Sequence, residues 1–230
     1  MTALRIAIIG PGKMGSAVAD LARVRGLEIA ATLGAGSPVT AQSLSGADVA
    51  IEFTEPSAAV ANVRACVIAG CPVVVGTTGW YDELPQLTRL VEVEGGALLW
   101  DANFSLGVHA AARLVEYAGA IFSRLPSFDP ALVETHHAAK RDAPSGTARM
   151  LQSRYAVASG REIPITSIRV GSVPGTHQLV LDGAFEQIVV SHEARDRRVF
   201  AEGALLAATW LVGRRGVFTL DDVLSSQETS

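Results

Sequence analysis

The 230-residue sequence has few cysteines, few lysines, no long apolar run and no excess of positive charge. The two cysteines, Cys66 and Cys71, lack the spacing of metal ligands, so neither a disulfide framework nor a cysteine metal site is expected. No apolar segment reaches the roughly 18 residues that a membrane span requires. The net charge of −4, without any basic run, argues against nucleic acid or a membrane as partners.

What remains is the composition of a compact globular protein. Hydrophobic residues make up 49% of the chain and charged residues 18%, which suffices for one large domain or two small ones. The first residues, Met-Thr-Ala-Leu-Arg, lead at once into an apolar strand and do not resemble a signal peptide. We therefore expect a cytoplasmic enzyme.

Lysine is scarce in an informative way. Of the 19 basic residues only Lys13 and Lys140 are lysines, and the other 17 are arginines. An ammonium group can give up its proton, whereas a guanidinium in a protein cannot. Both lysines lie inside motifs, so an amine is expected to be chemically required at these two positions, although a chance survival of two lysines in an arginine-rich chain is the simpler alternative.

The first motif lies near the N-terminus. The apolar run 4–9 is typical of a buried parallel strand, and a helical pattern begins at Ala17. Between them lies Gly10-Pro-Gly-Lys-Met-Gly15, a G-x-G-x-x-G sequence in the setting that dinucleotide-binding proteins use. The motif predicts cofactor contacts from the turn, that is from Gly10, Gly12, Lys13, Met14 and Gly15. A tight turn without a ligand is the alternative.

The type of dinucleotide stays open. The second expected strand, 28–33, runs into Gly34 without the acidic residue that binds the ribose of NAD. Lys13 would favour the 2′-phosphate of NADP, whereas Glu55 after the third strand would repel it if both point the same way. We expect NADPH or NADH as the cofactor.

The second motif is Glu134-Thr-His-His-Ala-Ala-Lys-Arg-Asp-Ala-Pro-Ser-Gly-Thr147. It places two histidines at the end of a strand, a lysine shortly after them, and a turn that opens a helix at Ser145 or Gly146. The free N–H groups at the start of such a helix bind carboxylate or phosphate. The segment therefore predicts a site for an anion and a proton; a packed histidine beside a solvated one is the alternative.

This segment closely resembles the signature of the 4-hydroxy-tetrahydrodipicolinate reductases, E-x-H-H-x-x-K-x-D-A-P-S-G-T-A, and meets every fixed position. The resemblance implies an NAD(P)H-dependent reduction of a cyclic dicarboxylate in the diaminopimelate route to lysine. It implies His136 and Lys140 as the catalytic acid/base and proton donor, and His137, Gly146 and Thr147 as ligands of the substrate. No metal is expected.

Two further loops resemble cofactor loops of the same family. Gly76-Thr77-Thr78 follows the apolar run 71–75, and Ala102-Asn103-Phe104 follows the run 97–100. Ligands of open α/β sheets bind at the carboxyl ends of the strands, where both loops lie. The resemblance implies that both contact the nicotinamide half of the dinucleotide.

The pattern of elements predicts an α/β protein of two domains. Residues 1–104 alternate apolar strands with helices, as in a Rossmann-type parallel sheet, and residues 205–230 are expected to complete this dinucleotide-binding domain. Residues 105–204 include β-branched runs separated by glycine turns, which indicate an α+β domain with an open mixed sheet for substrate binding and oligomerisation. With few helices to cover that sheet, a homotetramer is expected, as the resemblance implies.

Two other functions remain possible from the sequence. Another NAD(P)-dependent amino-acid or imine dehydrogenase would share the glycine-rich turn and a histidine, but has no need of the full signature. A non-catalytic NAD(P) sensor would bind the dinucleotide and require no proton donor.

Overall fold

The computed structural model describes residues 3–226, which divide into two compact units. The first unit consists of residues 1–104 and 200–230, and the second of residues 105–199. The sequence pattern had divided the chain after residue 104 and before residue 205. The return to the first unit lies at Phe200, five residues before the expected position at 205.

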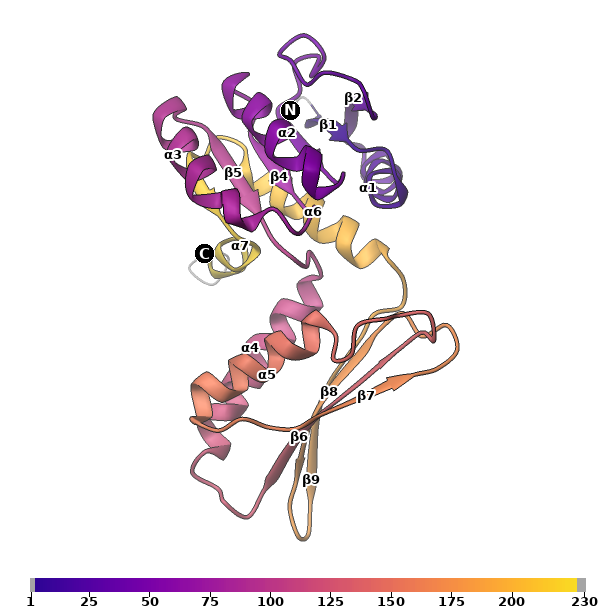
Figure 1. The fold of residues 1–230 in the computed structure, drawn as a ribbon, viewed down its shortest axis with the longest axis vertical. Coiled ribbons are helices and arrows are strands. Elements are labelled where there is room, and N and C mark those ends of the chain that lie inside the picture. The colour runs from indigo at the N-terminus through magenta and orange to yellow at the C-terminus, as the bar shows by residue number, and fades with distance from the viewer. Residues whose placement is uncertain (1–2, 227–230) are drawn as a thin grey trace. The chain divides into compact units, whose positions relative to one another are not determined.

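The first unit contains a six-stranded parallel sheet in the order β10-β5-β4-β3-β1-β2 (Figure 1). Its strands are β1 (Arg5–Ile9), β2 (Glu28–Leu33), β3 (Val49–Glu52), β4 (Val73–Val75), β5 (Ala97–Trp100) and β10 (Gly216–Phe218). Strands β1, β3, β4 and β5 are almost wholly buried, as strands covered on both faces of a parallel sheet are. The predicted Rossmann-type arrangement is therefore confirmed.

Helices connect these strands. They are α1 (Lys13–Val24), α2 (Pro56–Ile68), a 3₁₀ turn η1 (Tyr81–Glu83), α3 (Leu84–Glu94), α6 (Arg198–Leu211) and α7 (Leu220–Ser226). Pro56 opens α2 at the first helical position, where its missing N–H has no cost. Gly95 ends α3 in the left-handed conformation that glycine adopts without strain.

The early return to the first unit has a packing reason. Helix α6 begins at Arg198 and buries Ala201, Gly203 and Ala204 already in its first two turns. A Cβ atom on Gly203 would lie 1.8 Å from the carbonyl oxygen of Phe104, so the helix backbone packs directly against the end of the first segment.

The second unit has a four-stranded mixed sheet in the order β7-β6-β8-β9 (Figure 1). The strands are β6 (Asp129–His136), β7 (Ile165–Arg169), β8 (Thr176–Asp182) and β9 (Gln187–Glu193). Strand β7 is parallel to β6, whereas β8 and β9 are antiparallel to their neighbours. The predicted α+β domain with an open mixed sheet is confirmed.

Helices α4 (Leu106–Phe122) and α5 (Gly146–Ser159) pack together over one face of this sheet. Their apolar side chains, among them Val115, Leu151 and Tyr155, join Leu132 of β6 and Leu179 of β8 in one core. Residues of β6 alternate strictly between this covered face and the other one. Glu134 and His136 consequently point to the helices.

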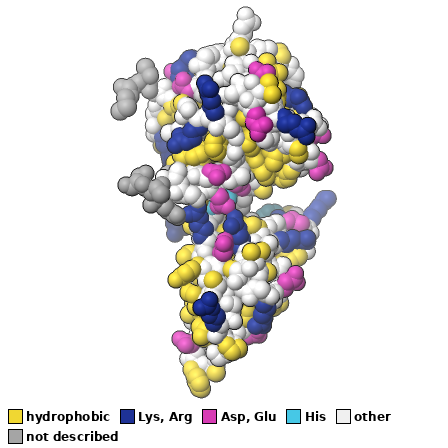
Figure 2. Space-filling view, turned by 90° about the vertical axis from the view of Figure 1, so that its left-hand side faces the viewer, with side chains coloured by type: hydrophobic (Ala, Val, Ile, Leu, Met, Phe, Trp, Pro, Cys, Tyr) yellow, Lys and Arg dark blue, Asp and Glu magenta, His cyan; other side chains and the backbone are white. Residues whose placement is uncertain are grey.

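The other face of the sheet is not covered by any described helix of its own unit. Val133 and Val180 are partly buried there, and Ile168 and Val189 are 42% and 45% exposed. Figure 2 views this unit from the side of α4 and α5, and there too hydrophobic side chains reach the surface. An uncovered apolar sheet face of this kind is typical of an interface.

No helix within residues 3–226 is long and apolar enough to cross a membrane.

Candidate active site

The glycine-rich turn lies between β1 and α1, and its three glycines have different surroundings. A Cβ atom on Gly10, whose φ is +91°, would lie 2.1 Å from the carbonyl oxygen of Phe53. A Cβ atom on Gly15 would lie 2.1 Å from the carbonyl oxygen of Gly10. Gly12, in contrast, has no atom within 4 Å of its Cβ position. Two glycines therefore close the turn, and the third leaves the backbone open to a ligand.

Helix α1 starts at Lys13, directly behind the open glycine. Gly12 is the N-cap and supplies no side-chain cap, and the first turn contains no acidic residue. The N–H groups of this turn are thus available to an anion, and the helix dipole favours negative charge there. The backbone fits the pyrophosphate of a dinucleotide.

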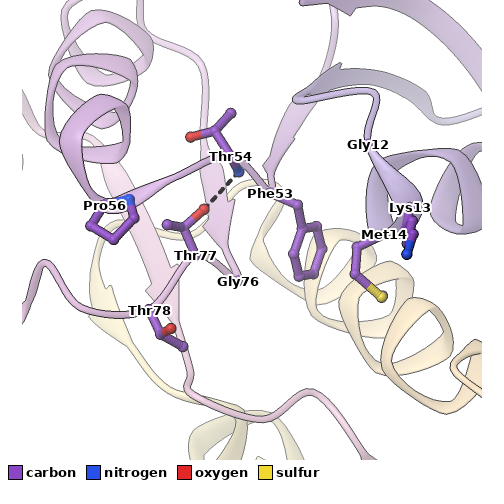
Figure 3. A pocket seen from close by; sticks show the side chains of 9 residues that line it. All are labelled: Gly12, Lys13, Met14, Phe53, Thr54, Pro56, Gly76, Thr77 and Thr78. Atoms are coloured by element: carbon purple, nitrogen blue, oxygen red, sulfur yellow. Dashed lines mark hydrogen bonds between the residues drawn. The ribbon is translucent and has the colours of Figure 1, made fainter. Parts of the chain in front are cut away.

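A cavity of about 440 Å³ opens beside the turn (Figure 3). It is lined by Gly12, Lys13, Met14, Phe53, Thr54, Pro56, Gly76, Thr77 and Thr78. The amide of Thr54 donates a 2.7 Å hydrogen bond to Oγ1 of Thr77, which joins the loops after β3 and β4. A Cβ atom on Gly76 would lie 1.9 Å from the Phe53 ring, so only glycine permits that ring its place in the cavity.

Of the remaining residues expected at the cofactor, none lines this cavity. Gly10 and Gly15 pack behind the turn, and Ala102 and Asn103 do not line the cavity. Phe104 packs edge-on against Phe53, with ring centroids 6.1 Å apart. The loop itself is fixed by Asp101, whose carboxylate accepts hydrogen bonds from the amides of Asn103 at 3.0 Å and Leu220 at 3.2 Å.

The two charges expected to act on a 2′-phosphate have different positions. Lys13 lines the cavity. Glu55 is not among the lining residues, and its carboxylate accepts a 3.0 Å hydrogen bond from the hydroxyl of Ser57. Among the described residues that line the cavity, Lys13 thus carries the charge.

In the second unit, a buried carboxylate organises the signature segment. Glu134 is 1% exposed; its Oε1 accepts hydrogen bonds from Nη2 of Arg169 at 2.7 Å and from the amide of Ser145 at 3.4 Å. Burial opposes ionisation, but the hydrogen bonds from Arg169 and Ser167 and the nearby positive charge outweigh it and hold the pKa of Glu134 at about 2. The carboxylate is therefore ionised at neutral pH.

His136 lies next to this carboxylate. Its Nδ1 is in direct contact with Oε2 of Glu134, and neither atom has another hydrogen-bond partner. Burial lowers the pKa of His136 below its usual value, and Glu134 partly offsets this. The opposite ring nitrogen, Nε2, faces Gly175, where an added Cβ would lie 3.0 Å away. The ring thus has one nitrogen on Glu134 and the other on the side that glycine keeps open.

The start of α5 has the backbone features of an anion site. Ser145 is its N-cap, and its Oγ accepts a 3.2 Å hydrogen bond from the amide of Ala148. Gly146 has no atom within 4 Å of its Cβ position, and the first turn, which includes Thr147, contains no acidic residue. The predicted helix start is confirmed, and its backbone is open to a carboxylate at Gly146.

His137 and Lys140 lie in the loop between β6 and α5. His137 is partly buried, and its carbonyl accepts a 3.0 Å hydrogen bond from the amide of Lys140. Nζ of Lys140 donates a 2.7 Å hydrogen bond to Oδ1 of Asp142, which lowers the pKa of that carboxyl group. Arg169 also donates to the carbonyl of Asp142 at 2.6 Å and so ties the loop to Glu134.

Sequence reasoning missed His177, Arg169 and the role of Glu134. His177 on β8 is 6% exposed, lies opposite Glu134 in the sheet, and its Nε2 is 3.2 Å from Oγ of Ser145. Burial and the neighbouring His136 lower the pKa of His177 to about 4, so it is neutral at neutral pH. The alternation of β8 could have placed His177 on the covered face, but only the strand register brings it to Glu134.

Glu134, His136 and His177 could in principle hold a metal ion, because one potential ligand atom from each lies within 4.8 Å of the others. Arg169 is, however, bonded to the same carboxylate and adds a positive charge beside it. A second cation is disfavoured there. The group is better suited to orienting a proton than to binding a metal, and we do not assign these residues as metal ligands.

The contrast between the glycines of the turn gives the first prediction. Replacement Gly12→Ala adds a methyl group in open space, so the thermal stability should stay unchanged while the Kd for NAD(P)H rises by about tenfold, or about 1.4 kcal/mol. Replacement Gly15→Ala forces a contact with the Gly10 carbonyl and should lower the melting temperature instead. Fluorescence titration and thermal unfolding separate the two. An unchanged Kd in Gly12→Ala would show that the ligand does not approach this backbone.

Comparison with known proteins agrees with this geometry in both units. The family model described as "Dihydrodipicolinate reductase, N-terminus" matches residues 4–104, and the one described as "Dihydrodipicolinate reductase, C-terminus" matches residues 107–224. Together they cover nearly the whole chain.

Individual relatives point the same way. The 4-hydroxy-tetrahydrodipicolinate reductase of Christiangramia forsetii is 33% identical over 96% of this chain and 98% of its own length. That of Haloarcula marismortui is 41% identical over 78% of this chain and 77% of its own length. The solved structure of a dipicolinate-bound dihydrodipicolinate reductase from Paenisporosarcina sp. TG-14 covers 95% of this chain and 98% of its own, with a TM-score of 0.80 at 23% identity, and so shows the shared fold. The chain, with a dinucleotide turn in one unit and the complete signature in the other, belongs to the 4-hydroxy-tetrahydrodipicolinate (dihydrodipicolinate) reductase family of NAD(P)H-dependent oxidoreductases.

Proposed function

We propose that this chain reduces 4-hydroxy-tetrahydrodipicolinate to tetrahydrodipicolinate in lysine biosynthesis, with His136 and Lys140 as the groups that supply the proton. The observation that supports these roles is the segment 134–147, which joins a buried, oriented histidine, a lysine and an open helix N-terminus within one unit. Reduction of an unsaturated ring needs a proton donor, and binding of its two carboxylates needs a positive charge and free N–H groups.

His136 is proposed as the general acid/base. Its ring is held at Nδ1 by Glu134, which leaves Nε2 to transfer a proton. Loss of the substrate's hydroxyl group as water would leave an unsaturated ring, and NAD(P)H, when bound, would supply the hydride that reduces it. His136 is proposed to supply the proton that completes this addition, and general acids of this kind contribute about 10²–10⁴-fold to a rate.

The carboxylates of the substrate are assigned to the start of α5 and to the loop before it. The backbone of Gly146 and Thr147 would hold one carboxylate through the helix N-terminus. Lys140 would pair with the other, exchanging its contact with Asp142 for the substrate, and His137 would add a hydrogen bond. Lys140 is also proposed as a proton donor.

The proposed dinucleotide contacts are those on the glycine-rich turn and on the two loops at the strand ends. Discrimination between NADPH and NADH is expected to be weak, because β2 ends in Leu33-Gly34 without an acidic residue. Lys13 on the cavity wall would then favour a 2′-phosphate modestly.

Continuous oxidation of NADPH or NADH with the cyclic substrate is the direct test of this function. Turnover with an open-chain imine and none with the cyclic dicarboxylate would indicate an amino-acid dehydrogenase. Cofactor binding without turnover of either compound would indicate a sensor.

Replacement of Lys140 by arginine separates a proton donor from a binding charge. Arginine keeps the positive charge and cannot release its proton, so Lys140→Arg should lower kcat by about 10²-fold or more while NAD(P)H binding stays near normal. His136→Gln should behave likewise, whereas His137→Gln should mainly raise the KM of the substrate. Steady-state kinetics measure all three.

The neighbouring exposed Arg141 provides the control, since Arg141→Lys should leave kcat unchanged. If Lys140→Arg keeps a wild-type kcat and only raises KM, Lys140 acts as a binding charge and the proton-donor role is wrong.

Replacement of Lys13 tests the cofactor assignment. Lys13→Ala should weaken NADPH more than NADH, by at most about 1.5–3 kcal/mol, the worth of a hydrogen bond to a charged group. Binding titrations with both dinucleotides measure the difference. Equal losses would place Lys13 at the pyrophosphate or outside the contact.

We further propose that the chain acts in the cytoplasm as a homotetramer, assembled through the uncovered face of the second sheet. The apolar side chains of that face, Val133, Val180, Ile168 and Val189, are the support for this assembly.

A charge on this face should dissociate the assembly. Val180→Lys lies on the central strand β8 and would have to bury an ammonium in an apolar contact, so sedimentation should show smaller species than in the wild type. Val157→Lys on α5 of the same unit, where Val157 is 83% exposed, is the matched control and should leave the assembly intact. A wild-type monomer at micromolar concentration would contradict the proposal.

A further inference from the structure

The buried side chains around His136 form one connected cluster. Glu134 contacts His136 through Oε2 and bonds Arg169 and Ser145 through Oε1. His177 packs its ring against His136, with centroids 5.1 Å apart, and reaches Oγ of Ser145. The acid and the anion-binding end of α5 therefore share the same buried partners.

The contact between Glu134 and His136 limits where the ring can carry its proton. Nδ1 of His136 and Oε2 of Glu134 have no other hydrogen-bond partner and are buried, so the two atoms can satisfy only each other. An ionised carboxylate can only accept, which places the hydrogen of neutral His136 on Nδ1. The second nitrogen is then the one that gains and loses a proton during the reaction.

The cation of Arg169 determines the state of Glu134. Nη2 of Arg169 holds the carboxylate at 2.7 Å, and the same guanidinium fixes the Lys140 loop through the carbonyl of Asp142. Because Glu134 is bonded to Arg169 on one oxygen, its other oxygen is left for the imidazole.

We propose that Glu134 and Arg169 are positioning residues of the reductase, which hold the Nδ1 proton of His136 so that the Nε2 proton is the one delivered to the substrate. In that step the Nε2–H bond of protonated His136 breaks as the C–H bond of the product forms, and the ring is left neutral with its hydrogen on Nδ1. The inference depends on the proposed role of His136 as the acid.

Glu134 and Arg169 have opposite effects on the pKa of His136. Glu134 raises the pKa of His136, whereas Arg169 and Lys140 lower it. The other titratable groups of the cluster are His177 on β8, His192 on β9 behind it, and Asp142, which faces Lys140. On the helix side, Ser145 of α5 is uncharged and the buried His109 belongs to α4.

The test compares Glu134→Gln, Arg169→Gln and the double variant by pH–rate profiles. As a general acid, His136 should give a pH–rate profile in which kcat/KM falls as the pH rises through the pKa of His136. This falling part of the profile is its alkaline limb. Glu134→Gln should move this limb to lower pH and Arg169→Gln should move it to higher pH, each by about one unit. Both should lower kcat at least about tenfold.

The double variant guards against misfolding, since it leaves no unpaired buried charge, and its limb should lie between those of the single variants. The matched control is the exposed pair Asp129–Arg161 on the same unit, at 2.9 Å, whose variants Asp129→Asn and Arg161→Gln should leave the limb unchanged. Limbs that move in the same direction in both single variants, or that do not move, would overturn the inference.

Nitrogen NMR of ¹⁵N-histidine-labelled enzyme gives a readout that does not depend on turnover. The signal of His136, assigned through His136→Gln, should report hydrogen on Nδ1 in wild-type enzyme and a mixture of tautomers in Glu134→Gln. A tautomer change without loss of kcat would keep the positioning contact but refute His136 as the acid. Loss of kcat with an unchanged tautomer would refute the positioning role.

Discussion

The interaction on which the second unit depends is the ion pair of Arg169 with the carboxylate of Glu134. The carboxylate is buried beside the start of α5, and it can stay ionised there because Arg169 lies on the neighbouring strand in register with His136. Without this cation, the carboxylate would be an unpaired buried charge, which costs several kcal/mol. The same carboxylate meets a proton-carrying ring on one oxygen and the backbone of Ser145 on the other. One electrostatic pair thus sets the places of the proposed acid and of the proposed anion site.

The dinucleotide unit uses a different principle, close backbone packing. Its turn is closed by glycines whose Cβ atoms would collide with carbonyl oxygens, and only Gly12 faces open space. The loops after β3 and β4 are joined by the Thr54–Thr77 hydrogen bond, and Gly76 leaves room for the Phe53 ring. This unit therefore has backbone N–H groups that can bind an anion, whereas the second unit has side chains that can carry a proton.

The sequence alone determined much of this protein. The strand, glycine-rich turn and helix at the N-terminus, the start of α5 and the mixed sheet all followed from local patterns, because periodicity and turn chemistry act over a few residues. The complete signature between Glu134 and Thr147 indicated the family in the same way, and the scarcity of lysine directed attention to Lys13 and Lys140.

Only the tertiary structure decided the partners of those residues. Arg169 and His177 lie on strands 35 and 43 residues from Glu134, and their contact with it depends on the pairing of β7 and β8 with β6. The return of the chain at Phe200 likewise depends on Gly203 packing on Phe104, a contact between segments about 100 residues apart. Local sequence specifies which elements form and which residues are chemically able to act. Strand register and the burial it produces decide which of those residues meet, because register depends on the whole sheet and on the core beneath it.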